Sequence, residues 1–371
     1  MRRKRRLGFA ARLCAGLLLA LLAAEPFFAA AQDGNPLLPE VRPWQVFLQR
    51  DIDSLGADRL IFINPFTDEE TAVEANGERY TPAGDGVIFF DPGANRVMVA
   101  LPNADVREHP FIQPGNDTRR VDWLVSPDHS TLAWTLAGGD TGLTTITTVA
   151  NLNGTNPRQV LMDGPRDGIR ALPVAFNADK TVLYMDFQPD GIADFTPYPQ
   201  FAGLFALDLA SGSWERLPGE PGCFCGAGFG AGLLLRLAVS PDLSGFDLRV
   251  VNLEGGVEQT LPGLRLRNYT QAGDVVISPD GTRAVYALAQ VRDFGRPGQS
   301  IQTVFVLVDL QAQTQTALTE PITTFVEPLA WTEDRSAVLL TSRQRDGTWK
   351  ISLGDGRLVK VAEATYLGTV G

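Results

Sequence analysis

Cysteine and histidine are scarce in this sequence of 371 residues, which holds three Cys and two His. Cys14 falls in an apolar N-terminal run, so the rest of the chain keeps only Cys223 and Cys225. A tetrahedral zinc site would need a second Cys or His pair, which the sequence does not contain. A single residue separates Cys223 from Cys225, and this spacing favours a local disulfide or a free pair over a metal site.

Long apolar runs and helical patterns are missing as well. Beyond residue 31 no stretch reaches the roughly eighteen apolar residues that a membrane-spanning helix needs, so we expect no span in that part of the chain. Apolar residues do not recur at the 3.6-residue period of a helix. No Ser/Gly/Pro-rich or charged linker divides the chain. These absences predict one all-β domain.

The N-terminus has a different character from the rest of the chain. Met1–Arg6 is basic, Leu13–Ala24 is apolar, and small residues lead up to Ala31 and Gln32. This layout predicts a secretory signal peptide over residues 1–31, cleaved between Ala31 and Gln32. An uncleaved anchor is the alternative. We therefore expect an exported bacterial protein that is periplasmic, displayed on the cell surface or extracellular.

Positive charge is in short supply once the signal peptide is set aside. Residues 1–31 hold six Lys/Arg and one acidic residue, which leaves 26 basic and 42 acidic side chains and a net charge of −16. Such a balance disfavours nucleic acid and anionic membrane surfaces as partners, because both would repel the protein.

One short pattern recurs through the remaining chain: an apolar strand, a turn built around Asp, and a second apolar strand. Its clearest copy is "VVISPDGTRAVYALA" at residues 275–289. Five further copies share this shape. The turn residues of the six copies are Asp91-Pro92, Ser126-Pro127-Asp128, Asn177 with Asp179, Ser240-Pro241-Asp242, Ser278-Pro279-Asp280-Gly281, and Thr332 with Asp334.

A second type of hairpin alternates with the first. One case is "TVFVLVDLQAQTQTALTE" at residues 303–320, and a spare copy occupies 59–73. Each unit therefore has about four strands, and repetition of such units without helices predicts a β-propeller with four-stranded antiparallel blades. Six turns predict six blades, and the spare hairpin leaves seven as the alternative. We expect the propeller over 57–371, preceded by an N-terminal extension at 32–56.

The apolar run, Ser-Pro-Asp-Gly turn and following "Val-Asp-Leu" strand together resemble the WD-like propeller repeat of TolB-type proteins. The same repeat forms the propeller of prolyl-oligopeptidase-type enzymes. The resemblance covers about residues 57–363 and implies the fold. It implies no particular activity, because propellers host many unrelated functions. No Gly-x-Ser-x-Gly nucleophile elbow occurs outside the repeats.

The Ser-Pro-Asp turns invite a catalytic interpretation, which the residue types do not favour. Ser278, Pro279, Asp280 and Gly281 each suit their position in a type I turn. A catalytic serine would need a base within hydrogen-bond reach. The only histidines are His109, expected on a surface loop, and His129, which sits within a turn. We therefore interpret these residues as structural.

Two stretches lengthen the interval between the third and fourth turns, and we interpret both as insertions. The first is "FQPDGIADFTPYPQFAG" at 187–203 and the second is "EPGCFCGAGFGAG" at 220–232. Aromatic residues at 194–201 offer a binding face, or they pack on their own blade.

Three carboxylates gather around the start of the first insertion. Asp186, Asp190 and Asp194 flank Gly191, and oxygen-rich loops of this kind can hold Ca²⁺. We expect a solvated inter-strand loop and no cofactor, and the alternative is Ca²⁺ bound by these three carboxylates.

The scarcity of histidine and the absence of a nucleophile motif favour a non-catalytic role. We expect a monomeric, exported propeller without catalytic activity that binds or scaffolds a protein or a glycan. The alternative is a propeller enzyme, such as a metal-assisted hydrolase or a lactonase-like protein, with carboxylates around the central channel.

Overall fold

The computed structural model divides into two units, Met1–Arg42 and Pro43–Gly371. It describes residues 43–50, 56–139, 141–191, 198–218, 226–293, 296, 298–323, 325–342 and 344–371, all in the second unit. The predicted signal peptide and its cleavage site at Ala31 and Gln32 lie outside these ranges. In the described residues, no helix has the length and apolar character that would let it cross a membrane.

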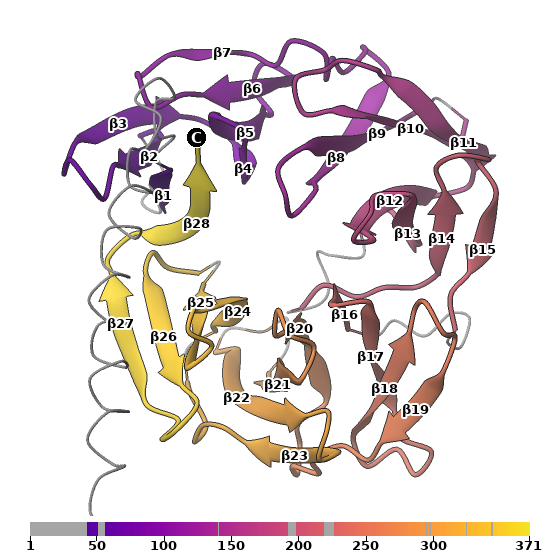
Figure 1. The fold of residues 1–371 in the computed structure, drawn as a ribbon, viewed down its shortest axis with the longest axis vertical. Coiled ribbons are helices and arrows are strands. Elements are labelled where there is room, and N and C mark those ends of the chain that lie inside the picture. The colour runs from indigo at the N-terminus through magenta and orange to yellow at the C-terminus, as the bar shows by residue number, and fades with distance from the viewer. Residues whose placement is uncertain are drawn as a thin grey trace, which may run out of the picture. The chain divides into compact units, whose positions relative to one another are not determined.

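Seven four-stranded antiparallel sheets form the blades of a ring (Figure 1). We number the blades in chain order and give their strands from the centre outward. Blade 1 is β4 (Glu78–Ala83), β5 (Gly86–Asp91), β6 (Arg96–Ala100) and β7 (Val106–Glu108); blade 2 is β8 (Thr118–Val125), β9 (Thr131–Gly138), β10 (Leu143–Asn151) and β11 (Arg158–Arg166); blade 3 is β12 (Ile169–Phe176), β13 (Val182–Pro189), β14 (Leu204–Asp208) and β15 (Trp214–Arg216).

The second half of the chain continues in the same order. Blade 4 is β16 (Ala227–Gly230), β17 (Leu233–Val239), β18 (Phe246–Asn252) and β19 (Glu258–Leu261); blade 5 is β20 (Gln271–Ile277), β21 (Arg283–Arg292), β22 (Ser300–Asp309) and β23 (Thr314–Ala317); blade 6 is β24 (Glu327–Trp331), β25 (Ala337–Thr341), β26 (Thr348–Ser352) and β27 (Leu358–Ala362); blade 7 is β28 (Thr365–Val370), β1 (Trp44–Gln49), β2 (Asp58–Ile63) and β3 (Glu70–Ala75).

Blade 7 joins the two ends of the ring. Its innermost strand β28 comes from the C-terminus and pairs with β1, where Trp44 lies opposite Val370. The spare hairpin at 59–73 supplies β2 and β3 of this blade. Strand β1 lies within residues 32–56, which the sequence analysis left outside the propeller. The expectation of six blades is thus wrong, and the alternative of seven is confirmed.

The blade count failed because one turn chemistry occurs at two places in a blade. The turns at Ser126, Asn177, Ser278 and Thr332 join the first and second strands, whereas those at Asp91 and Ser240 join the second and third. An Asp side chain that accepts backbone N–H groups stabilises a tight turn in either place. The number of Asp turns in the sequence therefore does not equal the number of blades.

Blade 4 contains its first strand in a stretch that the sequence analysis interpreted as an insertion. Residues 227–230 form β16 next to β20 of blade 5. A Cβ on Gly228 would lie 2.2 Å from the carbonyl oxygen of Val275, and one on Gly226 would lie 2.6 Å from the Cα of Gly273. Glycine is needed here because the two inner strands approach backbone to backbone.

The Ser-Pro-Asp turns are held by their own side chains. The Ser278 hydroxyl donates to Asp280 Oδ1 at 2.6 Å, and the N–H of Arg283 donates back to Ser278 Oγ at 2.9 Å. Ser126 and Ser240 make the same bond to Asp128 and Asp242. The serine hydrogen bonds hold the pKa of Asp242 and of Asp280 below the usual value. The pKa of Asp128 is lowered first by a hydrogen bond from Lys180 and then by the one from Ser126.

Apolar contacts between blades form the core. In β9, β13, β17 and β21 at least four consecutive residues are buried, which means that both faces of these second strands are covered. Packing of each blade against its neighbours provides this two-sided cover.

The two ends of the ring differ in the length of their connections. Strand direction alternates within a blade, so the connections between second and third strands and those between blades share one end, which we call the loop face. The loop face carries the long connections, such as 190–203, 262–270 and 318–326. The opposite turn face carries only short connections among the described residues. Long loops on a rigid scaffold are where binding residues concentrate.

Candidate functional site

The connection from blade 3 between β13 and β14 reaches two other blades. The side chain of Tyr198 is fully buried in the apolar cluster formed by residues of blades 5 and 6. Its ring stacks on that of Phe325, with centroids 5.6 Å apart. A Cβ on Gly273 of β20 would lie 2.4 Å from the Cβ of Tyr198, so only glycine lets this segment approach β20.

Further contacts hold the residues that follow Tyr198. Gln200 donates from Nε2 to the carbonyl oxygen of Ala272 at 3.4 Å. At the blade 3 end, the buried carboxylate of Asp186 accepts the N–H of Gly203 at 2.7 Å and that of Ala202 at 3.2 Å. Burial raises the pKa of Asp186, while these hydrogen bonds oppose the rise. Residues 198–203 thus form a tethered strap between blade 3 and blades 5 and 6.

A cavity of about 420 Å³ lies beside this strap. Its walls come from the inner strands of three successive blades, which surround the centre of the ring (Figure 1), and from the strap itself. Leu172, Pro173, Val174 and Phe201 supply the apolar part of the lining. The polar side chains that line it are Arg79, Asp122, Arg170, Gln188 and Gln200. Few polar groups in a partly apolar hollow are typical of a small-molecule site.

Asp122 of β8 is the centre of this polar group. Its buried carboxylate forms ion pairs with Arg79 of β4 and with Arg170 of β12, and the Arg79 contact measures 2.7 Å. The two guanidinium groups therefore come from the blades on either side. A buried carboxylate requires such partners, because removing one partner of a buried ion pair lowers the stability of the folded protein by about 3–5 kcal/mol.

The ion pairs continue toward the loop face. Arg170 Nε lies 3.5 Å from Asp190 Oδ1, and Arg120 Nε lies 3.1 Å from the same oxygen. The resulting row alternates Arg79, Asp122, Arg170, Asp190 and Arg120, so three cations face two anions. The surplus of one positive charge favours a ligand that carries a negative charge.

Arg79 adopts a backbone conformation that is unfavourable for its residue type. Its φ is +65°, in the left-handed region, and the pairing of β4 with β5 shifts register at this point. Such bulges redirect side chains and are frequent beside active sites. The guanidinium lies 4.9 Å from the centre of the Trp123 ring, whose Nε1 donates to Thr81 at 3.0 Å. The strain is consistent with a functional demand on Arg79.

The carboxylate and guanidinium groups at the cavity wall are suited to acid–base and electrostatic catalysis. A carboxylate can take a proton from water, and guanidinium groups can stabilise an oxyanion that develops at a carbonyl. The amides of Gln188 and Gln200 can donate to and accept from hydroxyl groups. The cavity therefore suits a polar, carbonyl-bearing ligand.

The structure places the predicted calcium ligands in different roles. Asp186 anchors the strap and Asp190 pairs with arginines, while Asp194 lies outside the described residues. Within those residues no group of three or more His, Cys, Asp or Glu is arranged to hold a metal ion, and we derive no step through a metal. Calcium at this loop remains the alternative to a metal-free loop. Cys223 and Cys225 also lie outside the described ranges.

His109 is buried, contrary to its expected surface position. Its Nδ1 accepts the N–H of Ile112 at 3.1 Å, and its ring meets that of Phe111 edge-on at 4.4 Å. Burial lowers its pKa to about 4. The surrounding cavity also contains His129. The two imidazoles lie between blades 1 and 2, away from Asp122.

Sequence reasoning missed Arg79, Asp122 and Arg170 because none belongs to a motif. A weak signal was present: each is a charged residue within the first strand of a blade, where apolar residues prevail. Recognising it required the correct assignment of first strands, which the mixed turn positions prevented.

No protein-family model matches the chain, and no curated protein sequence matches it. Solved structures do. A prolyl endopeptidase matches with a TM-score of 0.60 and 11% identity over 88% of this chain and 50% of the enzyme, so the chain spans about half its length. An oligogalacturonate lyase in complex with manganese matches with a TM-score of 0.53 and 14% identity, over 86% and 85% of the two chains.

A periplasmic gluconolactonase from Pseudomonas aeruginosa matches with a TM-score of 0.52 and 13% identity over 89% of this chain and 99% of that one. TolB from Acinetobacter baumannii matches at a TM-score of 0.42, with 13% identity over 76% and 64%. At such identities these likenesses show the fold alone. The β-propeller that the TolB-type repeat implied is therefore shown; a narrower WD-like assignment is not.

These neighbours correct the functional expectation drawn from the sequence. The propellers that match with TM-scores above 0.5 include an endopeptidase, a lyase, a lactonase and a puromycin hydrolase, each named for a catalytic activity. This finding contradicts the expectation of a non-catalytic binding or scaffolding module. The scarcity of histidine does not argue against catalysis, because carboxylates also carry acid–base chemistry.

Proposed function

We propose that this propeller is an enzyme that hydrolyses a small carbohydrate-type lactone or ester, at the cavity beside the strap. One observation carries the proposal: the carboxylate of Asp122 lies at the wall of the cavity between two arginines from neighbouring blades. The oligogalacturonate lyase and the gluconolactonase among the structural neighbours act on acidic sugars and sugar lactones, which supports this substrate class.

The proposed reaction is addition of water to the lactone carbonyl. Asp122 takes a proton from the water while the water oxygen forms a bond to the carbonyl carbon. Arg79 and Arg170 stabilise the oxyanion that forms. The ring C–O bond then breaks, and the leaving alkoxide receives the proton from Asp122. The product is an open-chain hydroxy acid; its new carboxyl group releases the second proton of the water to solvent, and the resulting carboxylate remains beside the arginines.

The remaining lining residues determine which substrates fit. Gln188 donates from Nε2 to Asp186 at 3.0 Å, which fixes its amide with the carbonyl oxygen on the other side. Gln188 and Gln200 can bond sugar hydroxyls, while Val174 and Phe201 cover the apolar face of a sugar ring. The cavity volume of about 420 Å³ suits a monosaccharide or a disaccharide better than a polymer.

We also propose that the enzyme acts after export from the bacterial cell. The support is the signal-peptide pattern over residues 1–31, which ends in the small residues before Gln32.

The test is hydrolysis of a panel of aldonolactones by the purified protein, followed with a pH indicator and corrected for spontaneous opening. We expect acid release to saturate with substrate and to be inhibited competitively by the hydroxy-acid product. Arg79→Gln should lower kcat more than it raises KM, because the oxyanion that Arg79 stabilises forms only as the reaction proceeds. Rates that equal the uncatalysed reaction for every lactone and ester would refute the proposal.

A further inference from the structure

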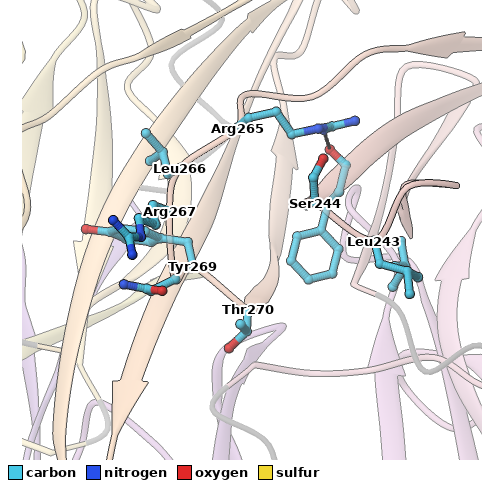
Figure 2. A pocket seen from close by; sticks show the side chains of 11 residues that line it. Leu243, Ser244, Arg265, Leu266, Arg267, Tyr269 and Thr270 are labelled. Atoms are coloured by element: carbon cyan, nitrogen blue, oxygen red, sulfur yellow. Dashed lines mark hydrogen bonds between the residues drawn. The ribbon is translucent and has the colours of Figure 1, made fainter.

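A second hollow lies on the loop face, at blades 4 and 5. It is an open groove of about 580 Å³ between residues 239–246, which join β17 to β18, and residues 265–270, which lead into β20. Figure 2 shows Leu243 on one side of this groove and Leu266, Arg267 and Tyr269 on the other. We call it the blade 4–5 groove. It is separate from the cavity at Asp122, which belongs to blades 1 to 3.

Leu243 is unfavourable for the fold in two ways. Its side chain is 81% exposed to water, and its φ of +57° lies in the left-handed region. The same position of the other Ser/Thr/Asn turns carries a glycine or a polar side chain, namely His129, Lys180, Gly281 and Arg335. An exposed and strained leucine in a place that suits glycine points to a role outside the folded core.

Val239 extends the apolar side of the groove. Its side chain is 50% exposed and lies at the end of β17, beside the turn that carries Leu243. Both side chains are aliphatic and branched, so they suit an aliphatic side chain of a partner.

Two arginines line the groove. Arg267 lies on the side opposite Leu243 (Figure 2). The side chain of Arg265 reaches across toward Phe246. Arg265 is fixed by Asp247 at 2.6 Å and by the carbonyl oxygen of Phe246 at 2.9 Å. Arg267 is exposed and makes no hydrogen bond or ion pair with any residue that the structure describes. No Asp or Glu lines the groove, although the chain as a whole has a net charge of −11. The groove is therefore complementary to an acidic partner.

We propose that the blade 4–5 groove binds an acidic peptide segment in which an aliphatic side chain lies next to carboxylates. The aliphatic side chain packs on Val239 and Leu243. A carboxylate pairs with Arg267, whose planar guanidinium can hold it through two hydrogen bonds. This site does not depend on the proposed hydrolase activity and would serve to recruit or locate the enzyme.

Fluorescence anisotropy with a fluorescein-labelled decapeptide of alternating Glu and Leu tests the site. We expect saturable binding that weakens as NaCl is raised. Arg267→Glu should weaken it by about 10-fold or more. Arg216→Glu makes the same charge change at an exposed position of β15, outside the groove, and should leave binding nearly unchanged.

Leu243→Gly separates binding from folding. Glycine relieves the left-handed backbone, so the melting temperature should rise by about 1–2 °C, while peptide binding weakens several-fold. A decapeptide of alternating Glu and Ser should bind less tightly than the Glu-Leu peptide. Three results would each overturn the proposal. Arg267→Glu and Arg216→Glu could reduce peptide affinity equally, or Leu243→Gly could leave it unchanged. The groove could also bind oligogalacturonate more tightly than the peptide.

Discussion

The ring of Tyr198, on the connection between the second and third strands of blade 3, stacks on the ring of Phe325, which precedes the first strand of blade 6; their centroids are 5.6 Å apart. This contact links one blade to the opposite part of the ring and fixes the strap that forms one wall of the candidate site. The strap and the ion-paired row at Asp122 are two features that the repeated strands and turns do not supply.

The anchoring role of Tyr198 predicts a large penalty for its removal. Tyr198→Ala deletes a fully buried ring and should lower the free energy of unfolding by about 3–5 kcal/mol. Tyr198→Phe keeps the stacked ring and is the matched control, with a loss that we expect to be much smaller. Urea unfolding followed by tryptophan fluorescence measures both. Equal losses for the two variants would show that the ring contact is not the anchor.

The close approach of blades 4 and 5 predicts that β16 cannot tolerate a side chain at Gly228. The new Cβ would lie 2.2 Å from the carbonyl oxygen of Val275, so the strands must separate, and Gly228→Ala should cost about 1–3 kcal/mol of stability. Gly354→Ala is the control, because its nearest neighbour would lie 3.8 Å away. The control should be neutral or slightly stabilising. A Gly228→Ala protein as stable as the control would contradict the packing.

The burial of His109 predicts a specific pH dependence of stability. The pKa of His109 is lowered from 6.5 to about 4 in the folded protein. Between these values the unfolded chain binds a proton that the native chain does not, so stability falls as the pH drops from about 7 to 4. The loss from this group approaches about 3 kcal/mol and is complete near pH 4.

His109→Asn tests this dependence, because Asn keeps an acceptor for the N–H of Ile112 but does not titrate. Unfolding free energies of both proteins should be measured at pH 7 and at pH 4.5. The wild type should lose more stability than the variant over this interval. Identical losses would mean that His109 is accessible to protons in the native state.

The repeat made most of the fold predictable from sequence. The hairpin at 303–320 and the turn at Ser278 both follow from local pattern. The blade number did not, because Asp91 and Ser240 place the same turn chemistry between different strands. Strand β16 was missed because a glycine-rich stretch is typical of a loop. The contact of β16 with β20 requires these glycines.

The candidate site was much less predictable than the fold. Tyr198 is buried beside Phe325, which is far from it in sequence. No periodic pattern in the sequence predicts this contact. Arg79 reaches Asp122 through a bulge and a left-handed backbone, neither of which its residue type suggests. Asp186, Asp190 and the aromatic residues at 194–201 were singled out in advance. The structure shows Asp186 as a backbone anchor, Asp190 as an ion-pair partner, and Tyr198 packed on blades 5 and 6.

The central claim is that Asp122 performs acid–base chemistry in the inner-strand cavity. The most direct test compares kcat for aldonolactone hydrolysis by Asp122→Asn and by Glu108→Gln, an equivalent change in the exposed Arg96–Glu108 ion pair of blade 1, with folding of both checked by circular dichroism. Loss of the base should lower kcat by about 100-fold or more, with Glu108→Gln at the wild-type rate. A folded Asp122→Asn protein that retains wild-type kcat would contradict the account.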